Sequence, residues 1–364
     1  MSETATLLVD SVTNLAGTGA PNLPVGVSVN GVPLASLNTM DYYAQSGEPA
    51  YPEDAALWFD TDDDAFKIYV NGEWLQVNYS NLPTFFGDRG VFAGGNDGAA
   101  QYNTIEYITI STTGNATDFG DLSVANYTFS ACSNGSRGVF GGGFVTPNAL
   151  NLIEYITIST LGNAIDFGDL TVARRYLASC SDGTYGLFAG GVSLKSIDYI
   201  TIATTGNAVD FGDFTSNMFA AAACSGGGRG VFGADVGSWD TMDYVTIATP
   251  GNATDFGDLT VGRQQTASCS DDSRGIFGGG TDGTVSNVMD YITISTPGNA
   301  TDFGDLTVAR NSLASCSNGP RGVFGGGIPN TNVIDYITIS TTGNATDFGD
   351  LTVAKNDLAA CSGD

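Results

Sequence analysis

The sequence has no histidine, and its 12 Lys and Arg are outnumbered by 39 Asp and Glu, which gives a formal net charge of −27 at pH 7. Histidine is the commonest metal ligand and general base, so its absence excludes Ser-His-Asp, Cys-His and His-metal mechanisms. The negative charge disfavours binding to nucleic-acid phosphates or to anionic lipid. We therefore expect no nucleic-acid partner. Because the sequence shows no other catalytic constellation, we also expect no cofactor and no enzymatic activity.

Long apolar runs are also missing, since no window approaches 18 consecutive apolar residues. The segment Met1–Asp10 has no basic stretch followed by an apolar one, so we expect neither an export signal nor membrane insertion. Only 14% of the residues are charged and 42% are hydrophobic, which differs from the composition of disordered chains. A hydrophobic core can therefore form.

One motif, Asp-Phe-Gly-Asp, dominates what the sequence does contain. Four strands can be read around each copy: a small-residue strand at Ser-Cys-Ser, a Gly-Val-Phe-Gly-Gly strand, an alternating Asp-Tyr-Ile-Thr-Ile-Ser strand and, after a Gly-Asn turn, the motif itself. Four short strands in about 46 residues predict one blade of a β-propeller. The motif, Asp-Phe-Gly-Asp, recurs at intervals of 48, 44, 45, 47 and 45 residues, beginning at Asp118, Asp166, Asp210, Asp255, Asp302 and Asp347.

The ends of the repeat array predict how the ring closes. Six strands of the Gly-Val-Phe type are present, but no small-residue strand precedes the first one at Arg89. An unaccompanied small-residue strand, Asn356 to Cys361, ends the array. Pairing these two strands would leave no free sheet edge. We therefore predict an all-β fold with a six-bladed propeller over residues 86–364, closed by the C-terminal strand.

The repeat unit resembles the kelch repeat. It matches in the Arg before the inner strand, in the glycine pair that ends the next strand, and in the Tyr and outer-strand aromatic that follow. It departs in having Phe where an outer-strand Trp is usual, and in Asn126 and Asn217 where the inner Arg is expected. The resemblance implies the propeller architecture, but a propeller implies no particular activity.

All length variation among the repeats falls in the loop between the second and third strands, which is 10, 10, 6, 7, 9 and 7 residues long. In a four-stranded blade this loop shares a face with the connection to the next blade. One interpretation is a binding face; the other is neutral variation in surface loops. Trp239 is the best single candidate, because an aromatic side chain in a polar loop suggests a sugar or protein contact. The candidate binding residues are Pro147, Asn148, Lys195, Trp239, Asn287 and Asn332.

A second candidate is a basic position before the inner strand, which would place four cations around the mouth of the central channel. They could form an anion site, or they could pair with nearby Asp-Phe-Gly-Asp carboxylates, which is the interpretation we favour. The four residues are Arg174, Arg263, Arg310 and Lys355.

The six cysteines occupy equivalent positions, each 14 residues after the start of an Asp-Phe-Gly-Asp motif. Sheets that pack face to face lie about 10 Å apart, whereas a disulfide needs Cα atoms within about 7 Å. We therefore predict six free thiols that act as small buried side chains near the hub, and no zinc site. Free thiols fit assembly in a reducing cytoplasm.

The acidic residues are largely repeat-borne, because two lie in each Asp-Phe-Gly-Asp motif and one precedes each repeat Tyr. This regular placement favours turn capping and inter-blade hydrogen bonds, with calcium binding as a minority alternative. The Asn-Ala-Thr triplets match a glycosylation acceptor, but the repeated hairpin turn explains them more simply.

Residues 1–85 contain no copy of the repeat and form a separate predicted module. The pairs Asn30-Gly31 and Asn71-Gly72 are hairpin signals. Leu57–Thr61, Phe66–Val70 and Glu73–Val77 read as a three-stranded meander, which would need docking or oligomerisation for stability.

The stretch Pro52–Val77, with Leu-Trp-Phe-Asp-Thr-Asp-Asp-Asp followed by Lys-Ile-Tyr-Val-Asn-Gly-Glu-Trp, resembles a short module of tail-fibre and other virion proteins of tailed bacteriophages. The resemblance implies a structural virion protein, assembled in the host cytoplasm in several copies or as a homo-oligomer such as a trimer. Its N-terminal module would bind other virion proteins, and its propeller would contact a host-surface glycan or protein, or neighbouring subunits.

Two alternatives remain open. A propeller glycosidase of sialidase type would need an arginine cluster, for which the basic ring is the only support. A bacterial kelch-type interaction scaffold unrelated to viruses is the other.

Overall fold

The computed structural model describes residues 87–234 and 239–363, together with six short strands before residue 87. The chain divides into two compact units, Met1–Leu82 and Pro83–Asp364. The described residues of both units are all-β, and none forms a helix that could cross a membrane.

The first unit contains a hairpin and a four-stranded sheet. The hairpin pairs Val29 with Val32 across Asn30-Gly31, as predicted. The predicted meander is also confirmed, and a fourth strand adds to it in parallel orientation. The strands are β1 (Ser28–Val29), β2 (Val32–Pro33), β3 (Tyr42–Gln45), β4 (Leu57–Asp60), β5 (Ala65–Val70) and β6 (Glu73–Gln76).

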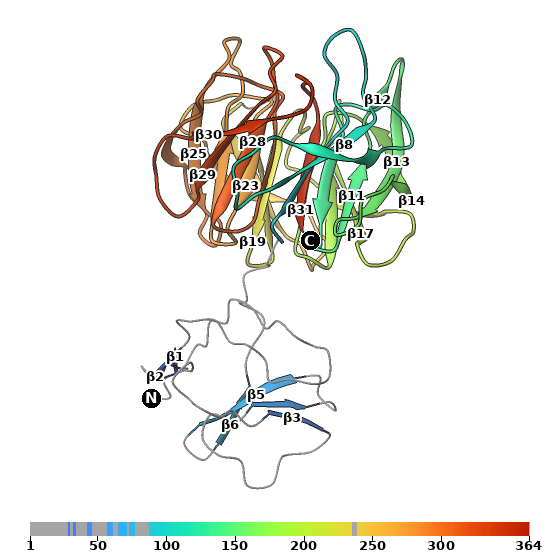
Figure 1. Ribbon diagram of the computed structural model, residues 1–364. Coiled ribbons are helices and arrows are strands. Elements are labelled where there is room, and N and C mark those ends of the chain that lie inside the picture. The colour runs from blue at the N-terminus through green and yellow to red at the C-terminus, as the bar shows by residue number, and fades with distance from the viewer. Residues whose placement is uncertain are drawn as a thin grey trace. The chain divides into compact units, whose positions relative to one another are not determined.

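The second unit is a six-bladed β-propeller (Figure 1), which confirms the predicted fold. Each blade is an antiparallel sheet whose four main strands follow one another from the channel outward. Blade 1 contains β31 (Ala359–Gly363), β7 (Arg89–Ala93), β8 (Thr104–Thr109) and β9 (Thr117–Asp121). Blade 2 contains β10 (Ser130–Ser133), β11 (Arg137–Gly141), β13 (Asn148–Thr157) and β14 (Ile165–Arg174), with β12 (Phe144–Val145) beside β13. Blade 3 contains β15 (Ala178–Ser181), β16 (Tyr185–Ala189), β17 (Ser196–Thr201) and β18 (Val209–Asp213). Blade 4 contains β19 (Ala222–Gly226), β20 (Arg229–Gly233), β21 (Thr241–Thr246) and β22 (Thr254–Asp258). Blade 5 contains β23 (Ala267–Ser270), β24 (Arg274–Gly278), β25 (Val288–Thr293) and β26 (Thr301–Asp305). Blade 6 contains β27 (Ala314–Ser317), β28 (Arg321–Gly325), β29 (Val333–Thr338) and β30 (Thr346–Asp350).

The ring closes as predicted, because the C-terminal strand β31 pairs with β7. Cys361 lies opposite Val91, and Ala359 lies opposite Ala93. Blade 1 is thus built from both ends of the array, and every blade has its full set of four main strands.

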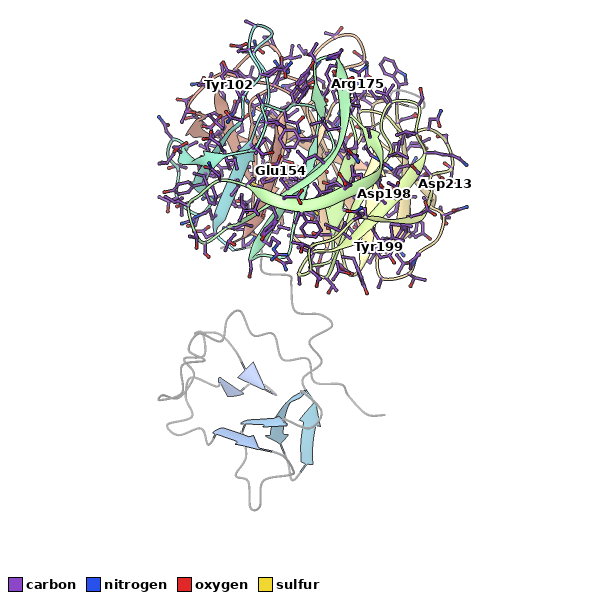
Figure 2. All side chains as sticks on the ribbon, turned by 90° about the vertical axis from the view of Figure 1, so that its right-hand side faces the viewer. Tyr102, Glu154, Arg175, Asp198, Tyr199 and Asp213 are labelled. Carbon is purple, nitrogen blue, oxygen red and sulfur yellow. The ribbon has the colours of Figure 1, made fainter. Side chains whose placement is uncertain are left out.

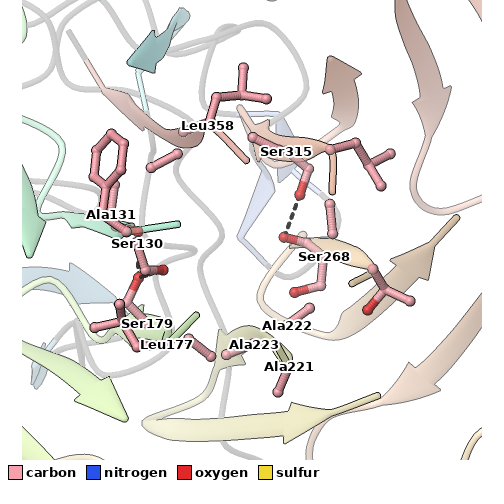
Figure 3. A pocket seen from close by; sticks show the side chains of 18 residues that line it. Ser130, Ala131, Leu177, Ser179, Ala221, Ala222, Ala223, Ser268, Ser315 and Leu358 are labelled. Atoms are coloured by element: carbon pink, nitrogen blue, oxygen red, sulfur yellow. Dashed lines mark hydrogen bonds between the residues drawn. The ribbon is translucent and has the colours of Figure 1, made fainter. Parts of the chain in front are cut away.

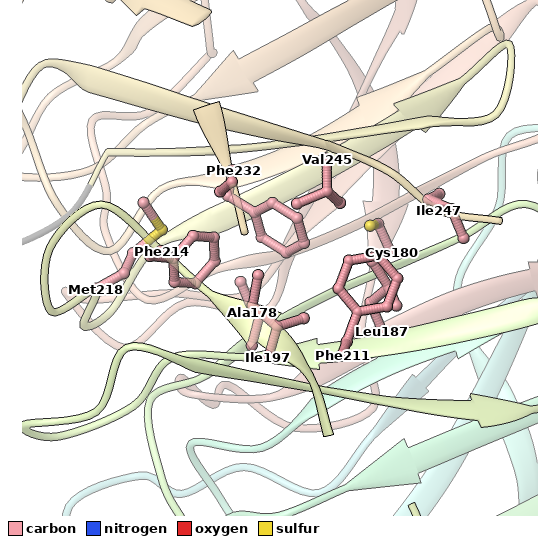
Figure 4. Packing of buried hydrophobic residues seen from close by; sticks show 12 residues of the cluster. Ala178, Cys180, Leu187, Ile197, Phe211, Phe214, Met218, Phe232, Val245 and Ile247 are labelled. Atoms are coloured by element: carbon pink, nitrogen blue, oxygen red, sulfur yellow. The ribbon is translucent and has the colours of Figure 1, made fainter. Parts of the chain in front are cut away.

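The core is divided into six clusters, each between neighbouring blades. In the cluster between blades 3 and 4, Phe211 and Ile197 of blade 3 pack with Phe232 and Val245 of blade 4 (Figure 4). The second strand of each blade is buried over four of its five residues, because a neighbouring blade covers each of its faces. This explains why the second strands read as unbroken apolar and glycine segments instead of alternating ones.

The glycine of each Asp-Phe-Gly-Asp motif lets the next blade approach closely. A Cβ built on Gly304, whose φ is +142°, would lie 2.5 Å from the carbonyl oxygen of Gly343 in the next blade's turn. In that turn the side chain of Asn344 accepts a hydrogen bond from the Asp305 amide over 3.1 Å. All six motifs make the same amide-to-Asn contact with the next blade. The Asn-Ala-Thr triplets are therefore inter-blade contacts as well as hairpin turns.

The six cysteines are free and buried, as predicted. Each thiol fills the space left by a glycine of a neighbouring blade: a Cβ on Gly322 would lie 2.4 Å from Cys269 Sγ. Burial raises the pKa of all six thiols, to about 12 for Cys224 and Cys361. These side chains are therefore packing elements.

Candidate functional site

A carboxylate on the third strand of every blade binds the end of the preceding blade's outer strand. In blade 3 the Thr171 amide donates to Asp198 Oδ2 over 2.8 Å, and its hydroxyl donates to Oδ1 over 2.7 Å. The acid before each repeat Tyr makes this contact in all six blades. The predicted inter-blade hydrogen bonds are thus present for this family of acids.

The four predicted basic residues do not line the channel mouth. Each is buried, precedes an inner strand, and is paired with the third-strand carboxylate of the blade to which that inner strand belongs, with Arg174 Nη2 2.8 Å from Asp198 Oδ1 and Arg310 Nη2 3.1 Å from Asp335 Oδ2. The favoured pairing with Asp-Phe-Gly-Asp carboxylates is therefore wrong. Burial lowers the pKa of each cation, and the paired carboxylate opposes that effect. The pairs are Arg174–Asp198, Arg263–Asp290, Arg310–Asp335 and Lys355–Glu106.

Two blades have no cation at this position. Asn126 occupies it in blade 2, as predicted, and binds backbone atoms of its own blade through its amide group. In blade 4 the residue is Met218, not Asn217: the Met218 carbonyl accepts from Gly191 as the Arg310 carbonyl accepts from Gly280. Asn217 is exposed, whereas Met218 is buried. The basic residues therefore stabilise four of the six blades internally, and they cannot bind a ligand carboxylate.

A different arginine series stacks on the repeat tyrosines. Arg321 opens the second strand of blade 6, lies 4.3 Å from the ring centroid of Tyr336 and donates to the Ile110 carbonyl of blade 1 over 2.9 Å. Four other blades repeat this arrangement, and Tyr185 replaces the arginine in blade 3. These contacts therefore join neighbouring blades to one another.

The channel mouth is formed by a closed ring of backbone hydrogen bonds, which we call the mouth ring. Each ring residue follows its Asp-Phe-Gly-Asp start by ten positions, and each amide donates to the ring carbonyl of the preceding blade over 2.7–3.0 Å. All six have φ between 53° and 59°, the left-handed region that side-chain-bearing residues rarely adopt. The ring consists of Thr128, Tyr176, Ala220, Gln265, Ser312 and Asp357.

The mouth ring has six different side chains on one repeated backbone conformation. Burial raises the pKa of the Asp357 carboxyl, although the nearby Ser312 hydroxyl and Asn96 Nδ2, 3.2 Å from Asp357 Oδ2, oppose the shift. Burial and then the Asp357 charge raise the pKa of Tyr176 to about 12. Tyr176 is therefore a neutral hydroxyl at physiological pH.

The residues around the mouth ring fall into two halves. Blades 2 to 4 contribute the aromatic arc of Tyr127, Phe144, Tyr176 and Phe219, with Tyr127 packed edge-on against Phe144 and Tyr176 against Phe219. Blades 5, 6 and 1 contribute an amide arc, in which Asn96 Nδ2 donates to Asn356 Oδ1 over 3.1 Å. The amide arc consists of Asn96, Gln264, Gln265, Asn311, Asn330 and Asn356.

A cavity continues from the mouth into the channel. Its outer part, about 70 Å³, is lined by the mouth ring and by the residue that follows each ring residue, directly before the inner strand. A deeper part of about 150 Å³ is lined by inner-strand Ala and Ser residues, with Ser130 and Ser179 across the opening from Ser268 and Ser315 (Figure 3). Thr266 Oγ1 lines the outer part, is buried, and makes no hydrogen bond with the described residues, whereas the buried Ser312 hydroxyl lies beside the Asp357 carboxylate.

The predicted loop residues lie in or at the end of the connections between the second and third strands of their blades. Tyr102, in the corresponding connection of blade 1, is labelled near the upper end of the propeller in Figure 2. Pro147 and Asn148 are exposed in the blade 2 hairpin, and Lys195 is exposed and lies 3.1 Å from Asp213. Lys195, Asn287 and Asn332 hold equivalent positions, where their carbonyls accept from the outer strand of their own blade. They therefore lie in three separate blades and do not form one site.

Trp239 is half-buried, with φ of 55°, and its carbonyl accepts from the Arg263 amide over 2.7 Å. Residues 236–238 of its predicted loop, which runs from residue 236 to residue 242, lie outside the described residues. Sequence reasoning missed the mouth ring, because six different residue types give no repeat signal. Counting ten positions from each Asp-Phe-Gly-Asp motif would have found it.

No model of a known protein family matches the chain, and no characterised protein has a detectably similar sequence. Among residues 87–234 and 239–363, no group of three or more Cys, Asp or Glu side chains is placed to hold a metal ion. The mouth presents hydroxyl, amide, carboxyl and aromatic groups.

Proposed function

We propose that this chain is an attachment protein of a tailed-bacteriophage particle, in which the first unit binds other virion proteins and the mouth face of the propeller contacts the host surface. The observation that carries the proposal is the contrast between a sixfold framework and a single face on which the side chains and loop lengths differ. Function in repeat proteins is commonly placed on such variable positions of a regular scaffold.

The assignment to a phage particle is supported by the resemblance of Pro52–Val77 to virion modules, and the kelch-like repeats supply a rigid head. The propeller carries 28 acidic residues against 11 basic ones, and nine of those basic residues are used in the buried ion pairs and the tyrosine stacks described above. Its surface is therefore strongly acidic, which favours solubility and disfavours adhesion to phosphate-rich surfaces.

The glycosidase alternative loses its support, because Arg174, Arg263 and Arg310 are buried in ion pairs. A sialidase-type site needs arginines that can reach a substrate carboxylate.

The test is mass spectrometry of purified particles from cells that make the chain, with antibodies against the propeller to locate it by immunogold labelling. We expect the chain in the particles, with label on an appendage. Its absence from particles, while it is present in the lysate, would contradict the proposal and favour the non-viral scaffold.

A further inference from the structure

In the mouth ring, the side chains and not the backbone amides are available to contact a ligand. Its six amides and six carbonyls are joined to one another, so the ring backbone presents no unused donor toward the opening. The left-handed conformation of six residues that carry side chains costs about 1 kcal/mol or more each, and glycine would avoid that cost. Five of the six positions nevertheless carry a polar or aromatic side chain, and the sixth is Ala220.

Two buried hydroxyls line the mouth, and one of them lacks a partner. Ser312 and Thr266 are each 7% exposed; the Ser312 hydroxyl lies beside the Asp357 carboxylate, whereas the Thr266 oxygen makes no hydrogen bond to the described residues. A buried hydroxyl without a partner is unfavourable, so Thr266 calls for a polar group inside the cavity. A ligand hydroxyl suits this position, because it can donate and accept.

The two arcs define the shape of that ligand. The aromatic arc offers apolar ring surface on one side, and the amide arc with Asp357 offers donors and acceptors on the other. A pyranose ring has this division, with a C–H face that packs on aromatic rings and hydroxyls at its edge. An acidic ligand fits poorly, because Asp357 lies in the mouth and Arg175 is stacked 4.2 Å from the Phe144 ring centroid.

We propose that the mouth ring binds the terminal uncharged sugar of a glycan, with hydroxyl groups bonded to Ser312, Thr266 and Asp357 and the sugar ring packed against Tyr176. This rests on the proposed attachment function and names the host-surface group that the propeller would contact. The six different ring side chains make the site asymmetric, as an asymmetric sugar requires.

The test applies the full chain to an array of uncharged and acidic glycans, followed by titration with methyl glycosides of glucose, galactose and mannose and with N-acetylglucosamine by saturation-transfer NMR. Ser312→Ala and Tyr176→Ala are suitable variants, because Ala220 already occupies an equivalent ring position with φ of 57°. Ser273→Ala is the matched control, since Ser273 is exposed in the turn between β23 and β24, away from the mouth ring.

We expect binding to uncharged glycans, weakened about fivefold by Ser312→Ala and about tenfold or more by Tyr176→Ala, with Ser273→Ala unchanged. No binding, binding to acidic glycans only, or equal binding by all variants would overturn the inference. Particle composition is measured separately, so the two proposals can fail independently: sugar binding by a chain absent from particles would refute only the virion assignment.

Discussion

The framework of the propeller, that is, the six blades and the contacts between them, differs from the mouth ring in what is repeated sixfold. In the framework the side chains repeat with the backbone: a motif glycine faces the next blade's turn, a thiol faces a neighbouring glycine, and a third-strand acid binds a Ser or Thr. In the mouth ring the backbone repeats and the side chains do not. Substitutions in the framework should therefore cost stability, and substitutions at the mouth should cost binding.

The largest effect is expected at the buried ion pairs. Asp335→Asn leaves the buried Arg310 without its counter-charge and should lower the free energy of unfolding by about 3–5 kcal/mol. The matched control is Asp243→Asn in blade 4, where Met218 replaces the cation and the loss should be about 1 kcal/mol or less. Urea unfolding of the two variants compares them, and equal losses would show that the cation contributes nothing.

The next effect tests the close approach of neighbouring blades. Gly304→Ala places a Cβ 2.5 Å from the Gly343 carbonyl oxygen and should cost about 2–3 kcal/mol. In Gly298→Ala the new Cβ meets nothing within 4 Å, so that control should cost less than about 1 kcal/mol. Thermal unfolding measures both, and a tolerated Gly304→Ala would mean that the blades can separate without loss.

A smaller effect, of opposite sign, is expected at the mouth. Because burial raises the pKa of Asp357, its ionised form is less stable in the folded protein than in the unfolded chain, and that penalty is present above the raised pKa. Asp357→Asn should therefore raise the melting temperature at pH 7 by no more than about 3 °C. The gain over wild type should disappear as the pH falls through the raised pKa toward the ordinary value near 3.8. A lower melting temperature at pH 7 would place Asp357 in the framework.

The smallest stability effect is expected for Trp239→Ala. Trp239 is half-buried in a variable loop, so the free energy of unfolding should change by about 0.5 kcal/mol or less, while adhesion to host cells weakens. Calorimetry and a cell-binding assay measure the two quantities. A large loss of stability would instead identify Trp239 as a core residue.

The repeat predicted the blades and the closure because framework side chains recur at fixed intervals, as Cys132 and Cys361 do. The hairpin at Asn30-Gly31 was predictable because its turn chemistry is local. The partner of Arg310 was not predictable from the sequence. The Asp-Phe-Gly-Asp acids and the acids before the repeat tyrosines recur with the same period, and only the strand register shows which of them lies beside the arginine. Met218 was missed for a related reason: the neighbouring Asn217 is the polar residue, but the backbone places Met218 at the buried position.

The pairing of β31 with β7 has a consequence for the order of folding. During synthesis, blades 2 to 6 can form one after another, but blade 1 lacks its inner strand until Ala359–Gly363 has left the ribosome. The Lys355–Glu106 pair forms only at that last step and joins residues 249 positions apart. An open array of blades can unravel from its ends, whereas the closed ring has no end blade. The pairing of β31 with β7 therefore turns an open array, in which each blade contacts only its neighbours, into a closed ring that behaves as a single cooperative unit.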